Sequence, residues 1–311
     1  MKRLIQVTTA LLIGALLSAA TVCNGEVVLT LALNKSFVKN VRNKATITTN
    51  LTVDAHPKDP HQIKDDGDDG DIHMAGRDSL IQLPLVAEIL NARREPTATQ
   101  LLKTVGIQPV SVSGAWRIWF EHLGSVDQIQ GTPAPTPYPK GSNPDHLFEI
   151  HPITSFAGID VLDSFVEIPG YQAYSASKAF PYYDDTDVTI QASDTAIMIA
   201  GGERKYNYAD FVIELAGKPK DVGDGFIVLG NVYEATGNLE NPASPIAHRM
   251  VFVKGTPPAA KLLTMSKGET VHVLGIPRVN LTEIFLIASK HGTTPVSMKL
   301  PYEMIIAAVL P

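Results

Sequence analysis

Short β-type segments separated by turn residues run along most of this chain, and they limit the folds open to it. Runs of valine, isoleucine, leucine and threonine are typical of strands, and the glycine and proline residues between them end each run. We expect strands at residues 27–33, 45–53, 71–75, 80–90, 110–122, 146–153, 186–200, 206–216, 226–234, 249–253, 270–274 and 280–288. Many short strands at regular spacing predict a barrel or a sandwich.

One segment has the pattern of a helix. Residues 95–106 (EPTATQLLKTVG) place a proline in the first turn and a glycine at the end, with Leu101, Leu102 and Val105 on one apolar face. Two long polar stretches read as loops: residues 56–70, which are rich in aspartate, and residues 131–145, which contain five prolines. The sequence therefore predicts a mainly β protein with one inserted helix.

The N-terminus has the three zones of a secretory signal peptide. Lys2 and Arg3 precede an uncharged apolar run at residues 4–17, and small residues follow as far as Gly25. A membrane-spanning helix needs roughly 20 apolar residues, so this run is short for one. We expect cleavage after residue 20 or 25 and export to the periplasm or the extracellular medium. A permanent anchor and acylation of Cys23 are the alternatives.

Composition limits both stability and partners. Cys23 is the only cysteine, so the exported part cannot form an internal disulfide. The remaining length suffices for two cores, and we expect a signal peptide at 1–25, a first β domain at 26–165 and a second at 166–311, with one continuous domain as the alternative. The net charge of −6, without a cluster of lysine and arginine, argues against nucleic acid or anionic lipid as a partner. No later segment is long and apolar enough to cross a membrane.

Two of the expected strands carry an acid and a histidine two residues apart. These are Asp71 with His73, and Glu149 with His151. Side chains two apart on a strand share a face, so we expect the four to lie on one side of neighbouring strands. Such a group would suit a divalent metal ion or acid–base chemistry. A structural, hydrogen-bonding role is the alternative.

These pairs belong to a longer pattern. Its parts are Gly70-Asp71-Ile72-His73, Val86-Ala87-Glu88, a strand from Gly114 to His122, and Phe148-Glu149-Ile150-His151-Pro152. Over about residues 45–160 the chain resembles a family of small bacterial proteins of unknown function. The resemblance implies a small OB-like β-barrel with one inserted helix, and it implies no activity. Met74 stands where that pattern has leucine, and the loop before His146 is longer. The second half resembles no family.

The acidic loop at residues 64–71 (KDDGDDGD) partly matches a calcium-binding EF-hand loop that would begin at Asp65. Gly67 and Gly76 stand at its third and twelfth positions, where oxygen ligands are required. A solvated acidic turn is therefore favoured over a calcium site.

For function, we expect a non-catalytic exported binding or structural protein, because OB-like barrels present a strand face and loops to a ligand. The ligand would be small and polar or sugar-like, and not nucleic acid. The exposed face would consist of Arg117, Trp119, Asp71, His73, Glu149 and His151. Trp116, Trp119 and Tyr138 would be the members of a stacking platform for a sugar or a base. Aromatic rings on a single strand more often belong to the core, so the core is the favoured interpretation. The alternative function is a metal-dependent hydrolase whose His–acid pairs hold a divalent ion that polarises a water.

Overall fold

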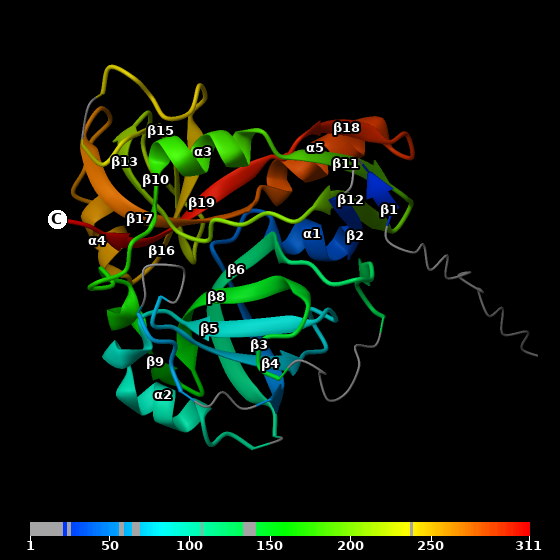
Figure 1. Cartoon of the computed structure of the whole chain (residues 1–311), viewed down its shortest axis with the longest axis horizontal. Coiled ribbons are helices and arrows are strands. Elements are labelled where there is room, and N and C mark those ends of the chain that lie inside the picture. Colours follow the sequence, from blue (N-terminus) through cyan, green and yellow to red (C-terminus); the bar gives the residue numbers. More distant parts are fainter. Residues whose placement is uncertain are drawn as a thin grey trace, which may run out of the picture.

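The computed structural model describes residues 21–23, 26–55, 59–63, 69–106, 108–132, 141–236 and 239–311. The strands in this part of the chain form three sheets, and five α-helices accompany them (Figure 1). The mainly β class expected from the sequence is confirmed. The signal peptide expected at the N-terminus lies almost entirely outside the described residues, so export stays a prediction.

The first barrel is a closed ring of five strands. Its strands are β3 (Thr46–Ala55), β4 (Ile72–Arg77), β5 (Leu85–Ile89), β6 (Val110–His122) and β8 (His146–Phe156). They follow the order β5-β4-β3-β6-β8, and parallel pairing of β5 with β8 closes the ring. Helix α2 (Pro96–Leu102), preceded by the short η1 (Ala92–Arg94), lies between the third and fourth strands. This is the expected OB-like barrel with its inserted helix.

The second barrel repeats this topology. Its strands are β13 (Ala209–Leu215), β15 (Gly225–Tyr233), β16 (His248–Val253), β17 (Thr270–Val279) and β19 (Tyr302–Val309). Their order is β13-β17-β19-β16-β15, closed by pairing of β13 with β15. Helix α4 (Pro257–Leu262) again lies between the third and fourth strands. A second barrel or sandwich was expected, and the structure has a barrel of the same OB-like kind.

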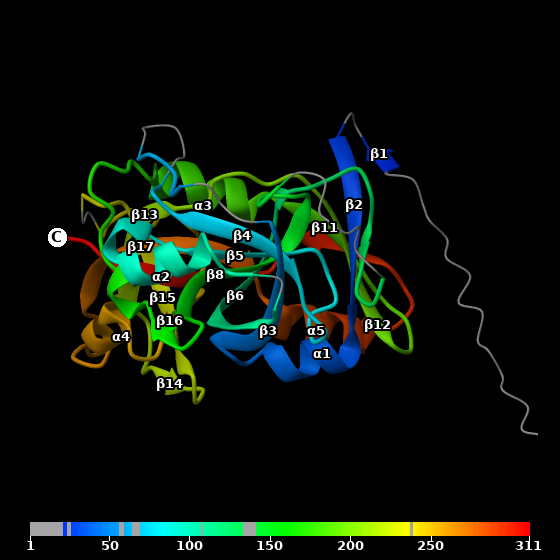
Figure 2. The same cartoon turned by 90° about the horizontal axis from the view of Figure 1, so that it is seen from below.

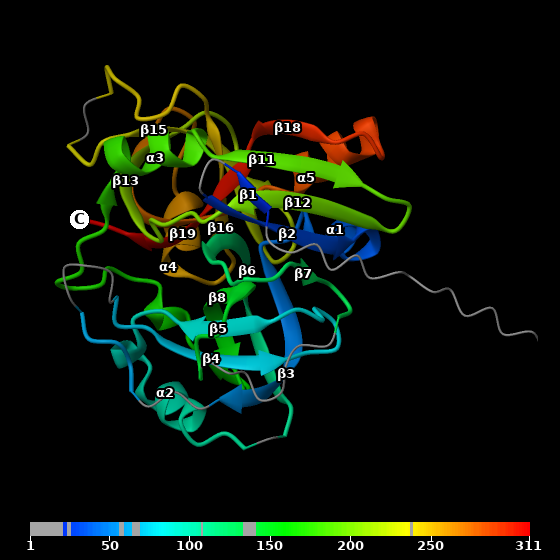
Figure 3. The ribbon, with the colours of Figure 1, turned by 45° about the vertical axis from the view of Figure 1, so that its right-hand side comes forward.

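The third sheet lies beside the two barrels (Figure 3). It consists of β1 (Thr21–Cys23), β2 (Glu26–Asn34), β7 (Gln128–Ile129), β11 (Asp187–Ala192), β12 (Ala196–Gly202) and β18 (Val296–Lys299). Helix α1 (Lys35–Val41) packs against β2, and α5 (Leu281–His291) packs against β11 and α1 (Figure 2). The sheet thus takes strands from both sides of the expected domain boundary at residue 165.

Short elements complete the described fold: β9 (Ile159–Asp160), η2 (Leu162–Ser164), β10 (Tyr174–Ser175), α3 (Ala176–Asp184) and β14 (Lys220–Asp221). The expectation of a single helix is wrong. In particular, residues 280–288 form most of α5 and not a strand, because the side chain of Asn280 accepts hydrogen bonds from the backbone amides of Thr282 and Glu283 and so starts a helix. No helix among the described residues is long and apolar enough to span a membrane.

Equivalent residues join the two barrels. Arg117 on β6 pairs in register with Glu149, and Arg278 on β17 pairs in register with Glu303. Arg117 Nε donates to the carbonyl of Pro277 at 3.1 Å, while Arg278 Nη1 donates to the carbonyl of Trp116 at 3.0 Å. Each arginine therefore hydrogen-bonds the residue that precedes its counterpart, and β6 packs against β17.

Candidate metal centre in the first barrel

The structure brings the two predicted His–acid pairs into one region of the first barrel. His73 lies on β4 and Asp71 directly before it, while Glu149 and His151 lie on β8. The two strands are not paired with each other, because β5 runs between them and pairs with both. Glu88 on β5 stands opposite His73 in the register and links the two pairs. The side chains therefore gather across three strands and not two.

The expected exposed binding face is wrong, because all six of its residues are buried. Arg117 and His151 are 0% exposed, Trp119 is 2%, and Glu149, Asp71 and His73 are 4%, 5% and 8%. For Arg117 and Trp119 the reason is the second half of the chain, which packs on these side chains. Arg117 reaches Pro277, and the Trp119 ring packs edge-on against Tyr183 and Tyr302.

The tryptophans do not form a stacking platform either. Trp116 is fully buried and lies under the guanidinium of Arg278, 3.7 Å from the ring centre. Tyr138, the third ring of the predicted platform, lies outside the described residues. Residues 64–68 of the acidic loop, for which a calcium site was the alternative, also lie outside them. The favoured interpretation, that the two tryptophans belong to the core, is confirmed.

Glu149 belongs to a buried ion-pair network. Its Oε2 lies 2.6 Å from Arg117 Nη1, and its Oε1 lies 3.0 Å from His146 Nε2. Arg117 also donates to Glu121 Oε2 at 2.8 Å. Burial alone would raise the pKa of Glu149, but the charge of Arg117 and the hydrogen bonds from the histidines hold it well below its usual value. This network is sufficient to explain a buried glutamate without a ligand.

His151 forms a second buried pair. Its Nδ1 lies 2.9 Å from Glu88 Oε2, and its Nε2 lies 2.8 Å from the hydroxyl of Tyr208. Burial would lower the pKa of His151, but the carboxylates of Glu88 and Glu149 raise it to about 10. Burial would likewise raise the pKa of Glu88, but His151 lowers it to about 2. An imidazolium has no free lone pair, so His151 in this state is an ion-pair partner and not a metal ligand.

The third group contains His73, Asp71 and two residues not expected from the sequence, His61 and Asp69. The backbone amide of His61 donates to the carbonyl of Asp71 at 2.8 Å, which holds the segment before β4 against the strand. His61 Nε2 then lies 3.1 Å from His73 Nε2, and His61 Nδ1 lies 2.8 Å from Asp71 Oδ1. Asp69 accepts from the backbone amide of Asp71 at 3.1 Å.

One hydrogen-bond partner assigns the ring proton of His73. His73 Nδ1 lies 3.0 Å from the carbonyl oxygen of Ser142, which can only accept, so Nδ1 carries the proton and Nε2 carries a lone pair. An ionised Asp71 beside His61 Nδ1 would favour the same tautomer there. Two lone pairs would then face each other across 3.1 Å. They would repel each other unless a metal cation or a shared proton lies between them.

Acidic side chains also gather at this point. Burial, together with the neighbouring carboxylates of Asp69 and Glu88, raises the pKa of Asp71 well above its usual value. Burial lowers the pKa of His73, which disfavours the imidazolium there. A bound cation would offset the carboxylate charge and use the neutral imidazole. The donors present, imidazole nitrogen and carboxylate oxygen, are those of a divalent transition-metal site.

The chain matches no protein-family model, and no curated protein matches its sequence significantly.

The sequence pointed to Asp71 and His73 but missed His61 and His146. Alternation along a strand identifies only residues that share a face of one strand, whereas His61 comes from the segment before β4 and His146 from the start of β8. His146 donates from Nδ1 to the carbonyl of Pro144 at 2.7 Å and stacks on His122, with ring centres 4.7 Å apart. The only signal for Glu88 was its place in the pattern that carries the family resemblance.

The second barrel has no counterpart of this polar group. The strand registers of the two barrels can be aligned on their Arg–Glu pairs. The residues of the second barrel at the positions equivalent to His73, Glu88 and His151 are then Ile227, Val251 and Ile305. These residues are buried and belong to an apolar cluster. The two barrels therefore share their Arg–Glu pairs, whereas the candidate centre belongs to the first barrel alone.

Proposed function

We propose that this chain is an exported, non-catalytic binding protein whose first barrel holds one divalent transition-metal ion between His61 and His73. The observation that carries the proposal is the approach of the two Nε2 atoms to 3.1 Å while both Nδ1 atoms face oxygen acceptors. A metal-ligand histidine typically donates its other ring N–H to a carboxylate or a backbone carbonyl. His73 Nδ1 has such a partner in the carbonyl of Ser142, and His61 Nδ1 lies 2.8 Å from a carboxyl oxygen of Asp71.

Zinc is the ion that these donors fit best. It binds imidazole nitrogens at about 2.0–2.1 Å in a tetrahedral arrangement, which places two such nitrogens roughly 3.3 Å apart. Magnesium and calcium prefer ligand sets made of oxygen, so two facing imidazoles argue against them. The side chain of His61 is 40% exposed, which gives an ion a route to the site from solvent.

An ion at this position would attach the His61 segment to the barrel. His73 is fixed on β4 and His61 precedes that strand, so an ion between them would hold the two together. Binding to the native state stabilises it by mass action, by about 2.7 kcal/mol when free metal is at 100 times Kd.

Metal content of the purified protein tests the proposal. We expect about one zinc per wild-type chain after saturation and dialysis, and its loss in both His61→Ala and His73→Ala. His291→Ala, which removes an exposed histidine at the end of α5, is the matched control and should retain the metal. A chelator should lower the melting temperature of the wild type and of the control but not that of the two site variants.

Two results would contradict the metal site. One is wild-type protein that takes up no zinc, which would leave a shared proton between the two imidazoles. The other is His73→Ala protein that binds as much zinc as the control. Comparing metal-free melting curves of all four proteins separates loss of metal from loss of folding. The hydrolase alternative would require zinc-dependent turnover of an ester or amide that His73→Ala abolishes.

A further inference from the structure

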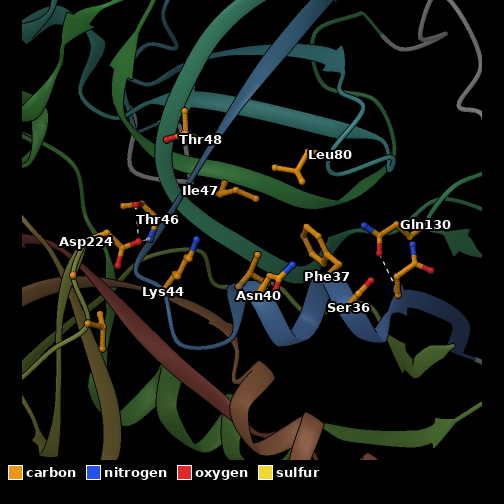
Figure 4. Close-up of a pocket in the computed structure, with 14 residues that line it drawn as sticks. Ser36, Phe37, Asn40, Lys44, Thr46, Ile47, Thr48, Leu80, Gln130 and Asp224 are labelled. Atoms are coloured by element: carbon orange, nitrogen blue, oxygen red, sulfur yellow. Dashed lines mark hydrogen bonds between the residues drawn. The ribbon is translucent and has the colours of Figure 1, made fainter. Parts of the chain in front are cut away.

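A groove with a volume of about 810 Å³ runs between α1, the start of β3 and the turn that connects β14 to β15 (Figure 4). Asp224 and Lys44 lie at one end, and Gln130 lies at the other. The volume is within the range of small-molecule sites. None of its lining residues belongs to the proposed metal centre, so a ligand bound in the groove would not depend on the metal ion.

The ends of the groove are held in place by hydrogen bonds. Asp224 accepts from the backbone amides of Ala45 and Thr46 at 3.0 and 2.9 Å, and from Thr46 Oγ1 at 2.8 Å. Gln130 accepts from the amide of Asn34 at 2.7 Å and donates to the carbonyl of Ile81 at 2.8 Å. Both side chains are thereby committed to the protein, and they give the groove a preformed shape.

Other polar side chains along the groove remain available. Ser36 and Asn40 project from α1, and Lys44 follows that helix. All three are exposed, and their side chains have no hydrogen-bond partner among the described residues. Apolar surface lies across from them, where Leu80 is 53% exposed.

We propose that this groove binds a neutral oligosaccharide. Amide, hydroxyl and ammonium groups match the many hydroxyls of a sugar, and the apolar surface at Leu80 matches its C–H faces. A polyanion is disfavoured, because among the residues that the structure describes Lys44 is the only cation that lines the groove, and Asp224 lies at the same end. An acyl chain is disfavoured, because it would strand the exposed polar groups of α1 without partners.

A panel of neutral trisaccharides, namely maltotriose, cellotriose and chitotriose, tests the proposal by calorimetric titration. We expect at least one to bind the wild type. Asn40→Ala should weaken that binding about fivefold, the loss expected for one hydrogen bond. Asn40→Trp should abolish it by filling the groove. Lys39→Trp is the matched control, because Lys39 is exposed on the same helix but does not line the groove, and it should bind like the wild type.

Three results would overturn the proposal. The first is no binding of any of the three sugars. The second is binding that Asn40→Trp leaves unchanged relative to Lys39→Trp, which would place the sugar elsewhere. The third is tighter binding of a trimer of galacturonic acid than of any neutral trisaccharide, which would show that the groove selects acidic ligands. Circular dichroism of the two tryptophan variants establishes that both are folded.

Discussion

Replacing Arg278 with methionine tests whether the buried arginines hold the two barrels together. Its guanidinium is fully buried and donates to the carbonyls of Lys44, Ala45 and Trp116, at 3.1, 3.1 and 3.0 Å. It also pairs with Glu303 at 2.7 Å. Methionine keeps the apolar stem but removes a donor from all three carbonyl groups, of which only that of Lys44 keeps another side-chain donor among the described residues, the indole N–H of Trp116 at 2.8 Å. Breaking a buried pair of this kind costs about 3–5 kcal/mol, a large share of the 5–15 kcal/mol typical of a folded domain.

The matched control is Arg249→Met. Arg249 pairs with the same carboxylate, with its Nε 2.7 Å from Glu303 Oε2, but its side chain is 24% exposed. Its removal leaves Glu303 paired with Arg278, so we expect a cost of only about 1 kcal/mol. The two variants differ mainly in burial and in the carbonyl groups that lose their donor.

Urea unfolding followed by far-ultraviolet circular dichroism measures both costs. We expect the free energy of unfolding to fall by about 4 kcal/mol in Arg278→Met, midway through the range for a buried pair. We also expect the unfolding transition to broaden, because one of the links between the two barrels is lost. Equal costs for Arg278→Met and Arg249→Met would refute the reasoning, since burial and the contacts to the first barrel would then contribute nothing.

Three further predictions concern other parts of the chain. Glu88→Gln should lower the free energy of unfolding by about 3 kcal/mol. This difference from the wild type should be largest between pH 4.5 and 6.5. Below that range it should shrink as Glu88 of the wild type becomes protonated towards its pKa of about 2, and above it as His151 loses its proton towards its pKa of about 10. A difference that does not vary between pH 3 and 9 would contradict the ion pair. Gly76→Ala should destabilise the first barrel by about 1–3 kcal/mol, because a Cβ would lie 2.5 Å from backbone, whereas Gly106→Ala has open space and should be neutral or stabilising in the same unfolding assay. Mass spectrometry of the exported protein should find a new N-terminus after residue 20 or 25, and an intact Met1 would contradict cleavage.

The sequence predicted the strands well where their residues alternate. On β3, every second side chain from Ile47 to Val53 is buried, which is the pattern that identifies a strand with one face in a core. Residues 280–288 were mistaken for a strand because isoleucine, phenylalanine and leucine dominate their centre. The stronger signal was local: Asn280 with Glu283 three residues later is a helix start, and Lys290, His291 and Gly292 mark its end.

The candidate site was predictable only in part, for a physical reason. Local spacing placed Asp71 beside His73 correctly, because side chains two apart on a strand share a face. What each side chain contacts depends on residues far away in sequence. Tyr208, which bonds His151, and Pro277, which accepts from Arg117, both come from the second half of the chain. Burial by that half turned an expected ligand-binding face into an interior network.

The shared topology of the two barrels is matched in the sequence only at positions where the backbone or a buried charge restricts the residue. Pro96, Gly114 and Arg117 each precede a matching residue in the second barrel by the same number of positions: Pro257, Gly275 and Arg278. Both glycines lie at bulges where a Cβ would clash. Between these points the two halves differ, because any apolar side chain of suitable size can fill a barrel.

The polar group at His73 and Glu88 is where the two barrels differ most in chemistry. Isoleucine and valine at the equivalent positions of the second barrel show that this topology closes without a polar group there. The ion pairs account for Glu88, Glu149 and His151, but closure of the barrel does not require a histidine at position 73, which is consistent with the metal site proposed for His61 and His73.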